Sequence, residues 1–244
     1  MKKIFFALSF YLVSCHVLVK AQDNQVLTAV DIVKKSIDAT GGEAYLRSIK
    51  TLYSNIKTEM EGRQVNWIVK EMVPNKGSFM VKYEGRTVFQ NWFDGKDGYE
   101  TNRGAVQKAD PKEFADKAYK QNIFNELDYI NPQLWTLERL EDGTVGKADC
   151  YKVKGTLKNG LVEIFYFDKL SNLMLRSDKL EKANQNSFKT TLYLNYKKYG
   201  KLVYYSELKM GEEGNFKTLV LEELLVNEKV EEGDFSPKVT APQN

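Results

Sequence analysis

The chain has 244 residues, of which 36 are basic and 33 acidic, so no large excess of positive charge favours nucleic-acid binding. Its only histidine is His16 and its cysteines are Cys15 and Cys150, which leaves no histidine and one cysteine beyond the N-terminal segment. This composition excludes a Ser-His-Asp or Cys-His catalytic site and a histidine-ligated zinc site there. We therefore predict a protein that is not an enzyme and that has no catalytic residues, no metal site and no cofactor.

The first residues have the features of a secretory signal. Two lysines precede an apolar run over residues 4–14, which is too short to span a bilayer. Ala21 is a small residue suited to a cleavage site, so we predict a signal peptide over 1–21 and an exported, periplasmic domain over 22–244. In the alternative interpretation, "LVSC" is a lipobox, and lipidation of Cys15 would make the chain an outer-membrane lipoprotein.

Two short helices are expected at the start of the domain. Apolar residues within 26–39 recur at spacings of four, three and four, as on one face of a helix, and Gly41 and Gly42 are typical helix C-caps. The stretch "EAYLRSI" (43–49) predicts the second helix.

From residue 50 the apolar period becomes two, which indicates strands separated by short polar turns such as "NKG" and "DGKDG". The predicted strands cover residues 51–61, 64–72, 78–84, 86–93, 134–140, 149–157, 161–168, 173–183, 188–199, 201–210 and 216–230.

One helix is expected to interrupt this series of hairpins. Asp110, Pro111 and Glu113 combine a capping residue, a proline at the first helical position and an acid near the helix start. The helix is predicted over about 111–128, with a broad apolar face formed by Phe114, Tyr119, Ile123 and Leu127. Because it breaks the hairpin order, we expect it to lie across the sheet as a cover.

No linker rich in proline, glycine or serine divides the chain, so we predict a single domain. The expected fold class is mainly β (α+β). It consists of one strongly curved antiparallel sheet, an open half-barrel of about 11 strands, with helices covering its concave face. A flat sheet of this width would curl or split.

The order of elements resembles that of a known bacterial exported family. The resemblance rests on "IDATGGEAYLRSIKTLYSNIKTEMEG" (37–62), "WFDGKDGYETNRG" (92–104), "KADCYKVKGTLKNG" (147–160), "YFDKLSNLMLRSD" (166–178) and "LEELLVNEKVEEGDFSP" (221–237). These stretches are similar to the outer-membrane lipoprotein-sorting-protein-like family, which has the LolA/LolB-like fold. The resemblance implies a carrier that holds acyl chains in an apolar cavity, and it carries no catalytic residues.

The expected ligand is therefore the acyl chain of a lipid or lipoprotein, or another apolar molecule. The expected ligand-binding residues are Trp67, Phe79 and Phe89 on successive hairpin strands, and Phe114, Tyr119, Ile123 and Leu127 on the inserted helix. We expect a monomer whose other partners are outer-membrane or envelope proteins, not nucleic acid. The alternative is an envelope scaffold with a filled core, in which the same aromatic residues only pack between sheet and helices.

Overall fold

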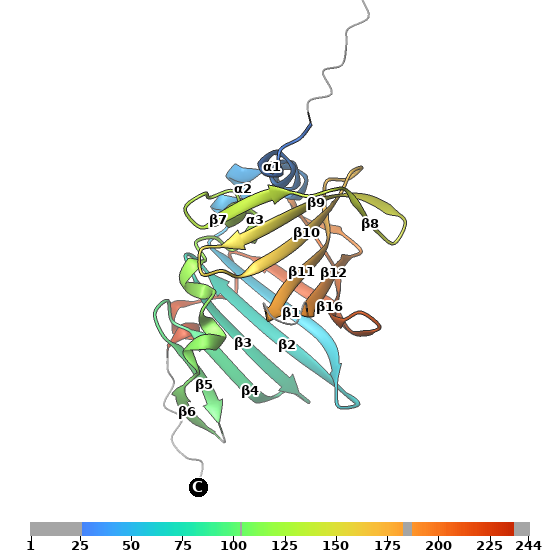
Figure 1. Cartoon of the computed structure of the whole chain (residues 1–244). Coiled ribbons are helices and arrows are strands. Elements are labelled where there is room, and N and C mark those ends of the chain that lie inside the picture. The colour runs from blue at the N-terminus through green and yellow to red at the C-terminus, as the bar shows by residue number, and fades with distance from the viewer. Residues whose placement is uncertain (1–25, 103, 183–186, 237–244) are drawn as a thin grey trace, which may run out of the picture.

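The computed structural model describes residues 26–102, 104–182 and 187–236, and Figure 1 shows their arrangement. The predicted signal peptide, its cleavage site and Cys15 lie outside the described residues. No helix in the described ranges is both long enough and apolar enough to cross a membrane.

The domain begins with two helices, α1 (Ala29–Thr40) and α2 (Glu43–Ser48), where the sequence predicts them. α1 starts three residues later than expected because Thr28 caps it. The Thr28 hydroxyl accepts a hydrogen bond from the Asp31 amide, and the Asp31 carboxylate accepts one from the Thr28 amide. Gly41 ends α1 with a φ of 145°, a conformation that favours glycine.

Strands make up most of the rest of the domain, as predicted. They are β1 (Thr51–Met60), β2 (Arg63–Met72), β3 (Lys76–Tyr83), β4 (Arg86–Phe93), β5 (Gly98–Asn102), β6 (Ala105–Lys108), β7 (Trp135–Arg139), β8 (Gly143–Val145), β9 (Ala148–Leu157), β10 (Val162–Asp168), β11 (Met174–Lys182), β12 (Ser187–Leu194), β13 (Lys197–Tyr199), β14 (Leu202–Tyr204), β15 (Glu207–Glu212) and β16 (Asn215–Val226).

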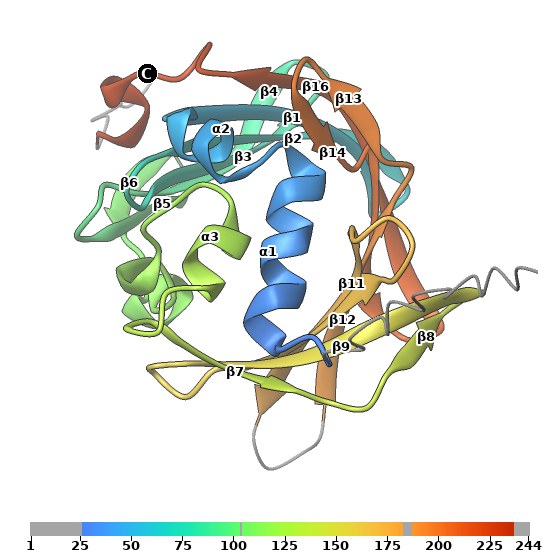
Figure 2. The ribbon, with the colours of Figure 1, turned by 90° about the horizontal axis from the view of Figure 1, so that it is seen from above.

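Fourteen of these strands form one antiparallel sheet, and β13 and β14 form a separate hairpin. The order across the sheet is β6-β5-β4-β3-β2-β1-β16-β15-β12-β11-β10-β9-β7, with β8 paired to β9. The first and last strands of this order, β6 and β7, do not pair, so the sheet is an open half-barrel. Figure 2 shows the sheet curving around the helices, with α1 inside the curve.

The strand count exceeds the expected number of about 11 for a simple reason. β5, β6 and β8 contain only five, four and three residues, which is too few for an alternating pattern to be recognised. The predicted strand 188–199 is divided because Asn195 has a positive φ of 53°, and the predicted strand 201–210 is divided between β14 and β15.

The prediction of one continuous helix over 111–128 is wrong. The segment contains two 3-10 turns, η1 (Pro111–Phe114) and η2 (Lys117–Tyr119), and one short helix, α3 (Asn125–Tyr129). The predicted start is present, since the Asp110 carboxylate accepts a hydrogen bond from the Lys112 amide. The helix does not continue, because Lys120 and Phe124 have extended backbones.

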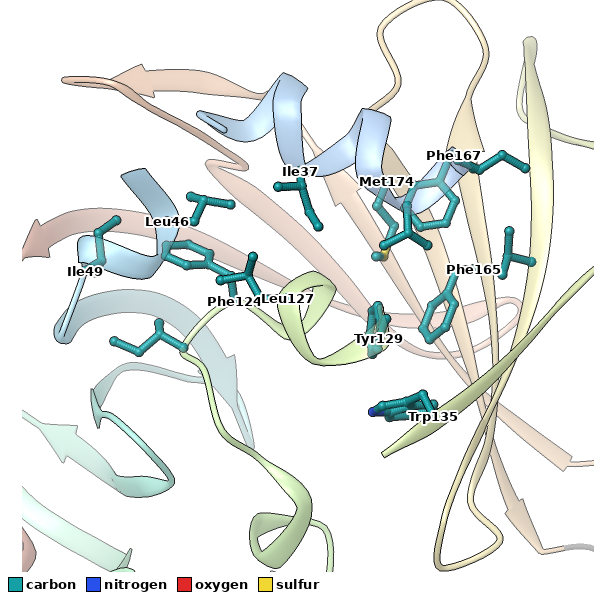
Figure 3. Close-up of a cluster of buried hydrophobic side chains, with 14 of the residues drawn as sticks. Ile37, Leu46, Ile49, Phe124, Leu127, Tyr129, Trp135, Phe165, Phe167 and Met174 are labelled. Carbon is teal, nitrogen blue, oxygen red and sulfur yellow. The ribbon is translucent and has the colours of Figure 1, made fainter. Parts of the chain in front are cut away.

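The main hydrophobic core lies between α1, α2, α3 and one end of the concave sheet face (Figure 3). Phe165 and Phe167 of β10 are fully buried in it, and the Tyr129 ring of α3 stacks on Phe165 with centroids 4.3 Å apart. At the other end of the chain, a last 3-10 turn, η3 (Glu232–Phe235), packs against β3 and buries Phe235.

Candidate ligand-binding site on the concave face

Strand alternation identifies the residues that face the inside of the half-barrel. Leu52 of β1 belongs to the main core beneath the helices, so Ile56, four residues further along, faces the same side. Ile56 pairs with Trp67, Trp67 pairs with Val81, and Val81 pairs with Phe89. Paired residues share a face of a sheet, and therefore Trp67 and Phe89 point inward.

Phe79 lies on the same face, two residues before Val81, and its ring joins those of its neighbours. The Trp67 and Phe79 rings meet edge to face with centroids 5.3 Å apart, and the Phe79 and Phe89 centroids are 6.2 Å apart. All three side chains are half-buried. The concave face thus carries a row of aromatic side chains across β2, β3 and β4.

This row continues into a second, smaller hydrophobic cluster, which adjoins the main core through Tyr193 and Leu221. Its buried members are Ile56, Leu208 and Leu219. The half-buried side chains in and around it come from six strands and the segment before β15. We call the half-buried set the apolar strip; it consists of Trp67, Val69, Phe79, Phe89, Tyr193, Tyr205, Met210 and Leu221.

Residues 109–124, between β6 and α3, cover the sheet beside the apolar strip, and we call them the covering segment. The Phe114 ring stacks on Phe93 with centroids 5.7 Å apart, and a Cβ added to Gly98 would lie 2.2 Å from the Phe114 ring. The Lys120 ammonium lies 2.5 Å from the Glu71 carboxylate. Phe93, Gly98 and Glu71 occupy neighbouring positions across the sheet, one step along the strands from the aromatic row.

The structure therefore does not bring the seven residues proposed from sequence into one site. Trp67, Phe79 and Phe89 form the aromatic row, whereas Phe114 packs over the adjacent position on β4 and β5. Ile123 and Leu127 are buried in the main core, and Tyr119 packs against that core from the side. These seven residues are Trp67, Phe79, Phe89, Phe114, Tyr119, Ile123 and Leu127.

Two cavities lie between the covering segment, α3 and the sheet. The first, of about 280 Å³, we call the charged cavity; its lining includes Glu113, Asp116, Lys117, Lys120, Asp128, Glu163 and Lys179. The second, of about 170 Å³, we call the tyrosine cavity; its lining includes Glu71, Lys120, Glu126, Tyr129, Tyr193, Tyr196, Tyr204 and Tyr205. Both are also lined by Asn125. Tyr193 and Tyr205 belong to the apolar strip as well, so the strip and the tyrosine cavity are adjacent.

Burial perturbs the charged groups of these cavities. Burial alone would raise the pKa of Glu71, but attraction to Lys120 and Lys117 outweighs it and the pKa is lowered. Burial raises the pKa of Glu163 to about 6, although Lys179 on the adjacent strand opposes the rise. Burial also raises the pKa of Glu126. The interior of the half-barrel thus combines an apolar strip with carboxylates that are poorly solvated.

Sequence analysis missed these inward-facing acids, although a signal for two of them was present. Glu71 follows Trp67 and Val69 in the alternation of β2, and Glu163 precedes Phe165 and Phe167 in that of β10. A charge that continues an apolar row faces the interior of the sheet. Within the described ranges, no three His, Cys, Asp or Glu side chains are grouped closely enough to hold a metal ion.

Comparisons with known proteins find similarity in structure but not in sequence. No protein-family model matches the chain, and no curated protein matches its sequence. A domain named as an outer membrane lipoprotein-sorting protein from Vibrio parahaemolyticus superposes with a TM-score of 0.58 at 16% identity, over 85% of this chain and 95% of that one. A LolA superfamily protein from Nitrosomonas europaea superposes with a TM-score of 0.60 at 10% identity, over 86% and 98%.

A third structure, of a DUF1329 family protein from Desulfovibrio piger, has a TM-score of 0.56 at 13% identity and covers 86% of this chain and 98% of that one. Each match spans nearly the whole of the neighbour and about 85% of this chain. At these identities the similarity concerns the fold. The resemblance read from the sequence is confirmed at that level: the chain has the fold of the LolA superfamily and of lipoprotein-sorting domains.

Proposed function

We propose that this protein is a binding protein that carries a ligand with an acyl or other long apolar chain, without catalysis. The observation that carries the proposal is the apolar strip. Eight apolar side chains on the concave face remain half-buried, next to a main core in which comparable side chains are fully buried. Apolar surface kept together on a concave face marks a ligand-binding site more often than a packing defect.

The strip offers enough surface to hold a chain. Each buried methylene contributes roughly 0.8 kcal/mol, so ten methylenes contribute about 8 kcal/mol. Association costs of about 4 kcal/mol or more must be subtracted. A chain of ten carbons therefore reaches about millimolar affinity and a chain of twelve about tenth-millimolar affinity, and shorter chains bind more weakly.

Among the seven residues proposed from sequence, Trp67, Phe79 and Phe89 are the direct acyl contacts in this proposal. Phe114 and Tyr119 belong to the covering segment at the border of the strip. Contact with Leu127, which is buried, requires that segment and α3 to move away from the core, whereas Ile123 already lines the tyrosine cavity. In this proposal Leu127 therefore belongs to a cover, and Ile123 to a preformed wall.

The proposal places the protein in the bacterial envelope, since the neighbours in fold are named for outer membrane lipoprotein sorting. It includes export by a signal peptide over 1–21 and a carrier domain over 22–244. The alternative processing at Cys15 would attach the same domain to the outer membrane. The second candidate function is an envelope scaffold, and the complete burial of Phe165 and Phe167 favours it for the helix-covered part of the interior.

The test is displacement of a fluorescent apolar dye from delipidated protein by dodecyl maltoside and by a diacylated lipopeptide. We expect displacement at submillimolar concentrations by at least one of them. Phe79→Ala should weaken binding by about tenfold, since it removes roughly 1.4 kcal/mol of contact. The control is Val88→Ala, because Val88 is also an apolar residue of β4 but is 60% exposed and lies outside the apolar strip.

Both variants should keep the thermal unfolding midpoint within a few degrees of wild type, which separates ligand contact from folding. If neither ligand displaces the dye, the carrier function is refuted and the scaffold becomes the better conclusion. Equal weakening by Phe79→Ala and Val88→Ala would place the binding site elsewhere on the molecule.

A further inference from the structure

The tyrosine cavity has a wall made largely of aromatic rings. The Tyr204 and Tyr205 rings stack with centroids 4.0 Å apart, and the Tyr205 ring also contacts Tyr193 at 5.2 Å and Tyr196 at 6.3 Å. These four residues come from β12, β14 and the segments that follow them. Together they line one side of the cavity of about 170 Å³.

The hydroxyls of these tyrosines already have partners. Tyr196 donates to the Met174 carbonyl at 2.6 Å, and the Tyr193 hydroxyl lies 3.1 Å from that of Ser177. The Tyr204 and Tyr205 hydroxyls bond to each other at 2.7 Å. Because the polar ends are satisfied, the contribution of this wall to a ligand is that of the electron-rich rings.

Glu126 of α3 lines the same cavity, and its carboxylate accepts a hydrogen bond from its own backbone amide. In the part of the chain that the structure describes, it forms no hydrogen bond or ion pair with the side chain of another residue. Its charge raises the pKa of Tyr193, Tyr196 and Tyr204, each of which is raised first by burial. The carboxylate therefore lies near the tyrosine wall without bonding to it.

The neighbouring cation, Lys120, attracts Glu126 and opposes the rise of its pKa, but it forms its ion pair with another carboxylate. Lys120 lines the cavity, but its ammonium is 2.5 Å from Glu71, which holds it in another ion pair. The cavity lining contains two acids and one base, which leaves one negative charge when all three are ionised. The adjoining charged cavity has four acids and three bases in its lining, so it supplies no compensating positive charge.

We infer that the tyrosine cavity binds the cationic head of an amphipathic ligand, an alkylammonium or quaternary ammonium group whose chain lies on the apolar strip. This inference rests on the proposed function and specifies its ligand. A cation is attracted to aromatic ring faces, and more strongly so in a site removed from water. Placed between the ring wall and Glu126, it would also supply the missing counter-charge.

Size and position support this assignment. A cavity of roughly 150 Å³ accommodates benzene, so about 170 Å³ has room for a trimethylammonium group. Tyr193 and Tyr205 take part in both the tyrosine cavity and the apolar strip, so head and chain of one molecule occupy adjoining surfaces.

The test compares three ligands with the same twelve-carbon chain by isothermal titration calorimetry below their critical micelle concentrations. They are dodecyltrimethylammonium, neutral dodecyl maltoside and dodecanoate. We expect the ammonium ligand to bind at least about tenfold more tightly than the neutral one, with dodecanoate weakest. Because this comparison uses wild-type protein, it does not depend on whether any variant folds.

A variant then assigns the preference to Glu126. Glu126→Gln should reduce the difference between the ammonium and neutral ligands to less than about twofold, and leave the neutral ligand unaffected. Glu138→Gln is the control, since Glu138 is an exposed glutamate of β7 whose side chain is 60% exposed.

The outcomes separate this inference from the proposed function. Binding of all three ligands with equal affinity, or tightest binding of dodecanoate, overturns the inference and leaves the carrier function intact. Absence of binding by all three refutes the carrier function and the inference with it. A preference for ammonium that survives in Glu126→Gln refutes the role of this cavity.

Discussion

Replacement of Glu163 by glutamine should stabilise the protein at neutral pH and have no stabilising effect in mild acid. Glu163 lies on β10 directly opposite Lys179 of β11, on the inward face that also carries Phe165. Glutamine has nearly the same shape as glutamate but does not ionise. The substitution therefore removes the charge and leaves the packing of the sheet almost unchanged.

The magnitude follows from the pKa of Glu163, which burial raises from 4.5 to about 6 despite the attraction of Lys179. The folded protein thus holds this proton more tightly than the unfolded chain does. Between pH 4.5 and 6 the unfolded chain loses its proton first, which makes unfolding easier as the pH rises. Above pH 6 the ionised group costs the folded state about 2 kcal/mol, and below pH 4.5 this cost is absent.

The assay is urea denaturation of wild type and Glu163→Gln at pH 4 and pH 8. The variant should be more stable than wild type by about 1–2 kcal/mol at pH 8 and equal to it at pH 4. Glu138→Gln is the matched control, because Glu138 also faces a lysine on the next strand but lies at the surface, where such a pair contributes about 0–1 kcal/mol. Destabilisation of Glu163→Gln by the same amount at both pH values would refute the reasoning.

Three further predictions concern the interior. Gly155→Ala should destabilise the protein by about 1–3 kcal/mol in urea denaturation, because the added Cβ would lie 2.8 Å from the buried Phe165 ring. Gly233→Ala is the control and should be neutral, because Gly233 has open space around it. Lys120→Met should lower the unfolding free energy by about 3 kcal/mol, because it removes the ion-pair partner of the Glu71 carboxylate. A loss below about 0.5 kcal/mol would contradict this ion pair. Cys150 is fully buried, and burial raises the pKa of its thiol. Iodoacetamide should therefore alkylate Cys150 only in denaturant, as measured by intact mass. Modification of the native protein would show that β9 opens.

The sheet could be predicted from the sequence because its signals are local. The alternation of Trp67, Val69 and Glu71 fixes the face of β2, and "DGKDG" separates β4 from β5 as predicted. The turn predicted at "NKG" lies slightly earlier, over residues 73–75. The strand order is also largely local, since most neighbours in the sheet are consecutive in the chain. The exceptions are pairings such as β1 with β16, which carry no sequence signal of their own.

The covering segment could not be predicted, because contacts distant in sequence override its helical pattern. Phe114 is held by Phe93, and Lys120 is held by Glu71 on a strand about fifty residues earlier. A continuous helix would hold Phe114 and Lys120 at a fixed spacing along one axis. Their partners lie on different strands, Phe93 on β4 and Glu71 on β2, and that spacing does not match the positions of these partners. Local propensity is a weak constraint against such packing.

The candidate site depends on both kinds of information. The inward position of Trp67, Phe79 and Phe89 follows from strand alternation, so it was accessible from sequence. The tyrosine cavity was not, because Glu126 comes from a helix of five residues and its facing tyrosines come from strands about seventy residues later. Only the folded chain brings a carboxylate and four aromatic rings to the same cavity.

The pairing of β1 with β16 has a consequence for how this chain reaches its native state. Leu52 lies opposite Val226, so the centre of the sheet is joined by residues from opposite ends of the domain. Contacts of such long sequence separation form late, since closing the intervening loop costs entropy before the pairing stabilises it. While synthesis is incomplete, β1 and β15 each expose an unpaired edge that can associate with other chains. We therefore expect slow, largely post-translational folding. The rate-limiting step should be the pairing of residues 215–226 with β1 and β15, between which they lie in the sheet.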